Sequence, residues 1–210
     1  MTATGNQWTS TEHALAYLSR ADQLPHRMEG EAVLLDLVPQ SAQRLLDLGT
    51  GDGRLLSLLR LDRPQAECVA LDFSPTMLAA ARDRFAGAPQ VTVIDHNLDQ
   101  PLPDLGLFDA IVSSFAIHHL SDARKRSLYG EIGDRLTPSG IFANLEHVAP
   151  VSDRWHRHFL TTLGYAPDYE DPSNILLDVE TQLRWLRELG FQEVDCYWKW
   201  LEMALLVGFQ

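Results

Sequence analysis

Hydrophobic and polar positions follow two alternating patterns along most of the chain. Short, nearly continuous apolar runs are typical of strands buried on both faces, and longer segments with apolar residues three or four positions apart are typical of helices. Helical segments follow the first, second, fourth and fifth apolar runs. This alternation predicts a parallel sheet covered by helices on both faces. The apolar runs lie at 44–48, 67–71, 91–95, 108–114 and 141–148.

Residues that begin and end helices stand at the boundaries of the helical segments. Thr9 and Glu12 form a capping-box pattern, which predicts a helix that ends before Pro25, and a second helix is expected over 28–38. Ser74 precedes a proline at the first helical position of another segment. These signals support the helical assignments independently of the hydrophobic pattern.

The chain after the fifth apolar run follows a different pattern. A helix is expected over 152–163, and a second amphipathic helix ends at Gly190. The apolar runs at 191–198 and 201–209 are close enough to pair as a hairpin. We therefore expect an α/β fold with a mostly parallel seven-stranded sheet, helices on both faces and a C-terminal antiparallel hairpin.

Composition and charge narrow the class of protein. Of the 210 residues 45% are hydrophobic and 22% charged, as in globular domains, and no apolar run reaches the roughly 18 residues that span a bilayer. The net charge of −12 disfavours nucleic acid as a partner and favours small molecules. Because the N-terminus predicts no signal peptide and Cys68 and Cys196 read as free thiols, we expect a cytoplasmic protein without a cysteine metal site.

A glycine-rich turn between the first strand and the next helix is the main candidate for binding chemistry. Asp47 is followed by Gly49, Gly51 and Gly53, and glycines let a ligand lie against the main chain. A dinucleotide fingerprint would require a third glycine where Arg54 stands, which disfavours an NAD oxidoreductase, and no Gly-Lys-Ser/Thr follows to make a phosphate loop. The turn therefore suits a cofactor without a pyrophosphate.

An acidic residue followed by Gly-x-Gly-x-Gly resembles the first motif of the class I S-adenosylmethionine-dependent methyltransferases, of the small-molecule type. The resemblance implies a Rossmann-like fold, S-adenosylmethionine as cofactor, and methyl transfer to an oxygen, nitrogen or carbon of a small-molecule acceptor. It implies that the loop lies under the methionine part of the cofactor. Asp72 ends the second strand, where a carboxylate can accept both ribose hydroxyls. The candidate cofactor-binding residues are Asp47, Gly49, Thr50, Gly51, Gly53, Asp72, Phe73, Met77, Asn97, Leu98, Ser113 and Arg27.

Several of these assignments have an alternative. The family places an Asp or Asn after the third strand on the adenine, which Asn97 fits best, with Asp95 as the other choice. Met77 packs either on the adenine or in the helix core. Arg27 either reaches the methionine carboxylate or pairs at the surface with Glu29 or Glu31.

The acceptor is expected at the carboxyl ends of the fourth and fifth strands, where open α/β sheets bind ligands. His118, His119 and His147 lie there and are the candidate bases, because histidine titrates near neutrality. His119 has a structural alternative, closing the strand onto the next helix, and packing is likewise the alternative for His118. Glu146 with His147, at the end of the fifth strand, is favoured as the acceptor-facing position. His156 and His158, with neighbouring aromatic residues, are candidates for lining a lid. No metal site is expected.

Two other functions share this fold. The tail over 179–205 also resembles the carboxy-S-adenosylmethionine synthase branch, whose chemistry requires a cation for an added carboxylate. No Arg or Lys lies between His158 and Leu183, which leaves Arg27 and Arg157 for that role. A non-catalytic S-adenosylmethionine-binding subunit is the other alternative.

The pattern as a whole indicates one methyltransferase domain over 1–210. We expect a helical lid over 1–40, a cofactor-binding core over 41–150, and a lid helix with the hairpin over 151–210. The acceptor molecule and the oligomeric state, a homodimer included, are left open by the sequence.

Overall fold

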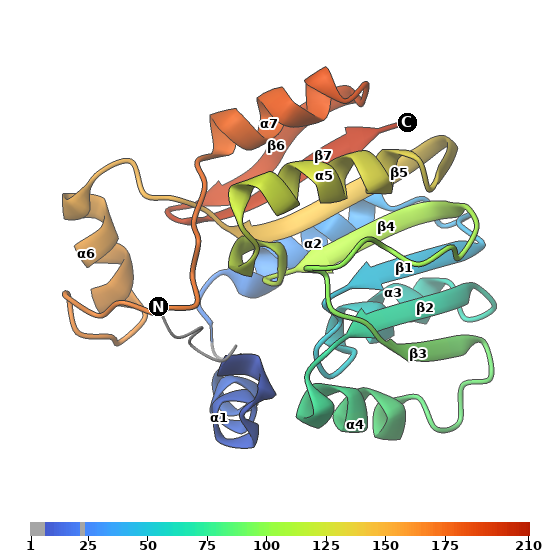
Figure 1. Cartoon of the computed structure of the whole chain (residues 1–210), viewed down its shortest axis with the longest axis horizontal. Helices are drawn as coiled ribbons and strands as arrows, with labels where there is room; N and C mark the ends of the chain where they lie inside the picture. Colours follow the sequence, from blue (N-terminus) through green and yellow to red (C-terminus); the bar gives the residue numbers. More distant parts are fainter. Residues whose placement is uncertain (1–6, 22–23) are drawn as a thin grey trace.

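The computed structural model describes residues 7–21 and 24–210. Its strands form one seven-stranded sheet in the order β3-β2-β1-β4-β5-β7-β6 (Figure 1). Strands β1 to β5 are parallel, and β7 lies antiparallel to both of its neighbours. The predicted fold, including the C-terminal hairpin, is confirmed. The strands are β1 (Arg44–Leu48), β2 (Glu67–Asp72), β3 (Val91–Asp95), β4 (Phe108–Ser114), β5 (Leu136–His147), β6 (Gln192–Trp200) and β7 (Met203–Phe209).

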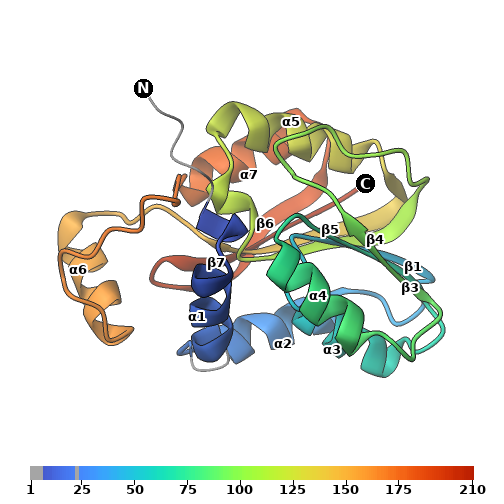
Figure 2. The same cartoon turned by 60° about the horizontal axis from the view of Figure 1, so that its bottom comes forward.

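The helices divide between the two faces and one end of the sheet. Helices α2, α3 and α4 lie on one face, and α5 and α7 lie on the other (Figure 2). Helices α1 and α6 lie beyond the end of the sheet (Figure 1), and α1 also contacts α4. The helices are η1 (Gln7–Thr9), α1 (Thr11–Ala21), α2 (Arg27–Leu37), α3 (Arg54–Asp62), α4 (Pro75–Arg84), η2 (Ile117–His119), α5 (Asp122–Gly133), α6 (Asp153–Thr162) and α7 (Val179–Glu188).

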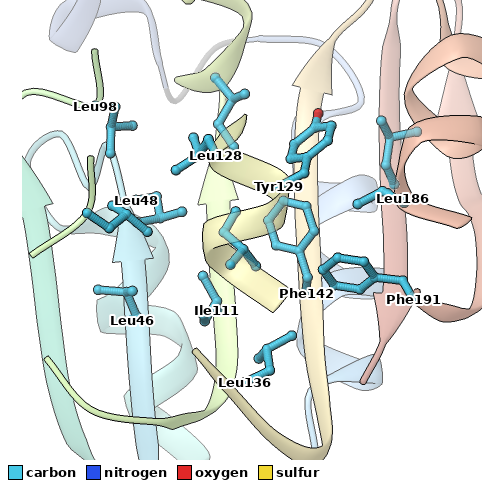
Figure 3. Packing of buried hydrophobic residues seen from close by; sticks show 14 of the residues in the cluster. Leu46, Leu48, Leu98, Ile111, Leu128, Tyr129, Leu136, Phe142, Leu186 and Phe191 are labelled. Atoms are coloured by element: carbon cyan, nitrogen blue, oxygen red, sulfur yellow. The ribbon is translucent and has the colours of Figure 1, made fainter. Parts of the chain in front are cut away.

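The larger apolar core lies between the sheet and helices α5 and α7 (Figure 3). Leu46, Ile111 and Phe142 point from β1, β4 and β5 to this face and pack with Leu128 and Tyr129 of α5. Each such side chain contributes roughly 1.5–3 kcal/mol by leaving water. This packing fixes the positions of the strand ends, where the candidate site lies.

The first helix begins differently from the prediction. Thr9 lies in η1, and α1 begins at Thr11, so the predicted capping box is wrong. Instead the Ser10 hydroxyl accepts the His13 N–H at 3.4 Å. The capping residue is therefore Ser10 and not Thr9, because Thr9 belongs to the turn of η1.

Two other local expectations also changed. Ser74 stands at the N-cap of α4, but its hydroxyl makes no capping bond, and Asp72 accepts the Ser74 N–H at 2.8 Å instead. β5 begins at Leu136, well before the predicted 141, and continues through Pro138. The proline is tolerated because the register between β4 and β5 is irregular at this point.

Both cysteines are free thiols, as predicted. Cys68 is buried in β2, and burial raises the pKa of its thiol to about 11. Among residues 7–21 and 24–210, no helix combines the length and the apolar character that a membrane crossing requires.

Candidate functional site

Two adjacent hollows lie at the carboxyl ends of the parallel strands. The first, here called the loop chamber, is lined by the glycine turn after β1 and by residues after β2, β3 and β4. The second, the outer chamber, has a volume of about 420 Å³ and lies between η2, the end of β5, and α6 with the loop after it. Trp8, Tyr17, Phe115 and His119 line both chambers and so form the boundary between them.

The glycine turn forms one wall of the loop chamber. Gly49 and Gly51 have φ angles of 67° and 58°, in the left-handed region that favours glycine. A Cβ on Gly49 would lie 2.2 Å from the Ala116 Cβ, so packing also requires glycine there. A Cβ on Gly51 would meet nothing nearer than the Met77 sulfur at 4.0 Å. The Gly51 main chain therefore borders open space, where a ligand can lie against it.

Two buried carboxylates face this space. Asp47 accepts the Thr50 hydroxyl on Oδ2 at 2.6 Å, and its Oδ1 has no hydrogen-bond partner among the described residues. Burial raises the pKa of Asp47 to about 7 and also raises the pKa of Asp72. Asp72 accepts the Gly51 N–H at 2.9 Å, which ties the end of β2 to the glycine turn. A positively charged or hydrogen-donating ligand would satisfy both carboxylates.

Most of the predicted cofactor-binding residues line the loop chamber. Gly53 does not, and Ser113 is fully buried with its hydroxyl donating to the Leu48 carbonyl at 2.8 Å. Asp95 is absent from the lining, whereas Asn97 is part of it. The predicted residues that do line the chamber are Asp47, Gly49, Thr50, Gly51, Asp72, Phe73, Met77, Asn97, Leu98 and Arg27.

Arg27 reaches the loop chamber from the start of α2. It is 5% exposed and so is not the surface arginine of the alternative, although it does pair with Glu31 as that alternative expected. Its Nε donates to Glu31 at 2.8 Å, and its Nη1 donates to the Tyr17 hydroxyl at 3.3 Å. Arg54 also donates to Glu31, at 2.9 Å. The buried Glu31 carboxylate therefore holds two guanidinium groups at one side of the chamber.

His118 forms a buried pair with Glu146 beside the outer chamber. Its Nδ1 lies 2.5 Å from Glu146 Oε1, and its Nε2 has no partner among the residues that the structure describes. Burial raises the pKa of Glu146 to about 7 and lowers the pKa of His118 well below its usual value. The backbone N–H of His147 donates to the same carboxylate at 2.9 Å. The pair therefore exchanges one proton near neutrality and presents Nε2 to the chamber.

Both ring nitrogens of His119 are engaged by the chain itself. Its Nδ1 donates to the Ser173 carbonyl at 3.0 Å, and its Nε2 accepts the Trp8 indole N–H at 3.1 Å. Burial lowers the pKa of His119 to about 3, consistent with a neutral ring in one tautomer. His119 thus connects the N-terminal segment to the loop that precedes α7.

The other three histidines singled out in the sequence separate into two groups. His147 and His156 line the outer chamber, together with Phe159. His158 is exposed on α6 and contacts the ring of Trp155, away from the chamber.

Sequence reasoning missed several lining residues. Trp8 and Tyr17 border both chambers, yet the N-terminal segment carries no motif that would identify them. Glu202 also escaped notice, although it lies within hydrogen-bonding distance of His147 and His156. A buried carboxylate between two histidines is a contact across three elements, which no local spacing reveals.

Comparison with known proteins gives concordant matches. Residues 45–140 match the family model described as a methyltransferase domain. An uncharacterized methyltransferase of Mycobacterium tuberculosis is 36% identical over 138 residues, which cover 65% of this chain and 68% of that protein. A carboxy-S-adenosyl-L-methionine synthase of Nautilia profundicola is 24% identical over 181 residues, 80% of this chain and 77% of that protein.

Solved structures share the fold along nearly the whole chain. An O-methyltransferase family protein from Burkholderia thailandensis has a TM-score of 0.75 at 18% identity, covering 97% of this chain and 61% of that one. The chain thus spans about three fifths of that protein. The N-methyltransferase NodS of Bradyrhizobium japonicum, in complex with S-adenosyl-l-homocysteine, has a TM-score of 0.72 at 20% identity and covers 98% of each chain.

Proposed function

The chain belongs to the class I S-adenosylmethionine-dependent methyltransferases, and from this premise we propose that it methylates a hydroxyl of a small molecule held in the outer chamber. The observation that carries the proposal is the buried pair of His118 and Glu146, whose free Nε2 borders that chamber. A hydroxyl must lose its proton during methyl transfer, and this nitrogen is placed to take it.

The residues of the loop chamber fit the cofactor. S-adenosylmethionine carries two cationic groups and a carboxylate, and the chamber offers the unpartnered Asp47 Oδ1 and the buried Arg27. Asp72 stands at the end of β2, where it would accept the ribose hydroxyls, and Asn97 and Leu98 would border the adenine. When bound, the cofactor supplies an electrophilic methyl carbon, and the electrons of its carbon–sulfur bond stay on sulfur.

The pair of His118 and Glu146 provides the base in this proposal. When the pair has lost one proton, Nδ1–H donates to the carboxylate and the Nε2 lone pair faces the acceptor. The hydroxyl proton then passes to Nε2, and the buried carboxylate stabilises the imidazolium that forms. The geometry therefore gives each of the two residues a defined part in moving one proton.

His119 receives a different role, because neither of its ring nitrogens is open. We propose that it positions Trp8 and the loop at Ser173 over the two chambers, and thereby excludes water from the reacting groups. The same proposal divides the chain into a helical lid over 1–40, a cofactor-binding core over 41–150, and a lid helix with the C-terminal hairpin over 151–210.

The carboxy-S-adenosylmethionine synthase alternative is less well supported. Its chemistry requires a cation for the added carboxylate, and the described residues that line the outer chamber include no Arg or Lys. Arg157 is exposed on α6, and Arg27 is paired with Glu31 at the loop chamber. Methyl transfer to a neutral acceptor is therefore the function that the site supports best.

The test measures cofactor binding and turnover separately. Titration calorimetry with S-adenosylmethionine and S-adenosylhomocysteine should show micromolar binding, about −8 kcal/mol, with NAD as the control ligand. Asp72→Ala should weaken this binding strongly. His118→Gln should retain binding but lose formation of S-adenosylhomocysteine with a panel of phenols and enols, whereas the exposed His158→Gln should change neither. Absent cofactor binding, or a fully active His118→Gln, would refute the proposal.

A further inference from the structure

Glu202 is a buried carboxylate whose side-chain partners are two histidines. It lies in the turn between β6 and β7 and is 2% exposed. Its Oε2 lies 3.2 Å from His147 Nε2, at the end of β5, and 3.0 Å from His156 Nδ1, on α6. In the part of the chain that the structure describes, no other side chain bonds to it. Because a carboxylate accepts, the ring nitrogen that faces it carries the proton in each histidine.

This arrangement fixes what the two histidines present to a ligand. With Nε2 of His147 and Nδ1 of His156 protonated, His147 Nδ1 and His156 Nε2 are left as hydrogen-bond acceptors. Neither nitrogen has a hydrogen-bond partner among the described residues. Neither is fully buried, so a ligand in the chamber can reach both. Both residues line the outer chamber. This wall of the chamber therefore favours a ligand that donates a hydrogen bond.

The ring of His147 lies next to the ring of His118, the proposed base. The ring centroids of His118 and His147 are 5.7 Å apart at an interplanar angle of 68°, and the Phe159 ring lies 5.3 Å beyond His147. Tyr165 and Tyr169 stack on each other at 4.7 Å, and both line the same chamber. A volume of about 420 Å³ with such walls suits a flat ring system of small-molecule size.

The charges around the chamber disfavour an anionic acceptor. Glu170 and Asp171 line it, and the buried Glu146 and Glu202 lie directly behind its histidines. No Arg or Lys is found among its described lining residues. A carboxylate on the acceptor would meet acidic groups without a permanent cation, whereas a hydroxyl would find an acceptor nitrogen.

We propose, building on the proposed hydroxyl methylation, that the acceptor is a neutral flat ring that bears two hydroxyls. One hydroxyl lies at His118 Nε2 and receives the methyl group. The other donates to Nδ1 of His147, which Glu202 holds in the accepting tautomer. His147 is therefore the residue that determines specificity for the second hydroxyl, and it takes no part in moving the proton.

The experiment compares ligands that differ in one group. Calorimetry with the full chain and saturating S-adenosylhomocysteine measures binding without turnover. The probes are naphthol, naphthoic acid, and two dihydroxynaphthalenes with hydroxyls on adjacent or on alternate carbons. One of the two diols should bind about tenfold more tightly than naphthol, because one added hydrogen bond contributes about that factor. Naphthoic acid should bind most weakly of the four probes.

Variants then identify the residue responsible. His147→Phe should reduce diol affinity to that of naphthol and leave naphthol unchanged, while His147→Gln, whose amide can donate and accept, should restore part of the preference. The exposed His158→Phe is the matched control and should change nothing. The proposal would be overturned if naphthoic acid bound most tightly, or if His147→Phe lowered the affinity for every probe by the same factor. Those outcomes leave the His118→Gln turnover result untouched, so the two proposals fail separately.

Discussion

Asp47→Asn should make the protein more stable above neutral pH while weakening its hold on the cofactor. Asp47 is 1% exposed and its Oδ1 has no partner among the described residues, and burial raises its pKa from 3.8 to about 7. The folded state therefore keeps a proton that the unfolded chain releases at lower pH. Stability from this group is full below pH 3.8 and is lost as the pH rises to about 7.

The size of this effect follows from the shift. At 1.36 kcal/mol for each pKa unit, the ionised Asp47 destabilises the fold by on the order of 4 kcal/mol above pH 7. Asparagine is neutral and nearly the same shape, so it removes this penalty and leaves the Thr50 hydroxyl a partner. At pH 4 both side chains are mostly neutral, and the two proteins should be about equally stable.

Urea denaturation at several pH values measures the difference directly. The free energy of unfolding of Asp47→Asn should exceed that of the unmodified protein by a few kcal/mol at pH 8 and converge with it near pH 4. Asp36→Asn, on the exposed face of α2, is the control. Cofactor affinity should fall at least tenfold, because the carboxylate that attracts its cation is gone. A pH-independent difference, or a destabilised variant at pH 8, would refute this reasoning.

Three further predictions concern catalysis and packing. The logarithm of kcat/KM should rise with slope one up to a pH of about 7, the pKa of Glu146, and then level off, because the pair with His118 must lose its proton; a profile that is flat from pH 5 to 9 would contradict this. His119→Ala or Trp8→Phe should raise KM more than it lowers kcat, in steady-state assays, since His119 bonds both the N-terminal segment and the loop at Ser173 that border the chambers. An effect on kcat alone would argue for a direct role. Leu46→Ala should cost about 2–5 kcal/mol in urea unfolding, and a loss below 1 kcal/mol would show that its core position is misassigned.

The fold and most residues that line the loop chamber could be predicted because their signals are local. Short apolar runs separated by helical segments indicate parallel strands, and Asp47 with its glycines occupies a few consecutive positions. Asp72 was expected at this edge of the sheet because a strand end has a fixed place relative to the preceding loop, and it lines the chamber. Ser113 shows the limit of such reasoning. Successive strand residues point to opposite faces of the sheet. The buried Ser113 hydroxyl therefore donates to the Leu48 carbonyl, while the next residue lines the chamber.

The acceptor side was harder to predict because it is built from distant contacts. His118 and His119 are neighbours in sequence and equivalent as a motif, yet one binds Glu146 and the other binds Trp8 and Ser173. Which of the two histidines keeps a ring nitrogen without a hydrogen bond depends on partners that lie between 28 and 111 residues away in the sequence. Their roles diverge through tertiary structure, so only the residue type, and not the role, could be read from the sequence.

The place of β7 in the sheet has a consequence for biosynthesis. β7 is synthesised after β6 but lies between β5 and β6 in the sheet. The strand with which β6 pairs is β7. While the chain leaves the ribosome, β6 emerges before its neighbour exists and must wait unpaired until β7 is inserted. The turn that joins them carries Glu202, so the carboxylate behind His147 and His156 reaches its place only when β7 pairs. Both apolar cores also include side chains of β7, so they too are completed only when this strand pairs.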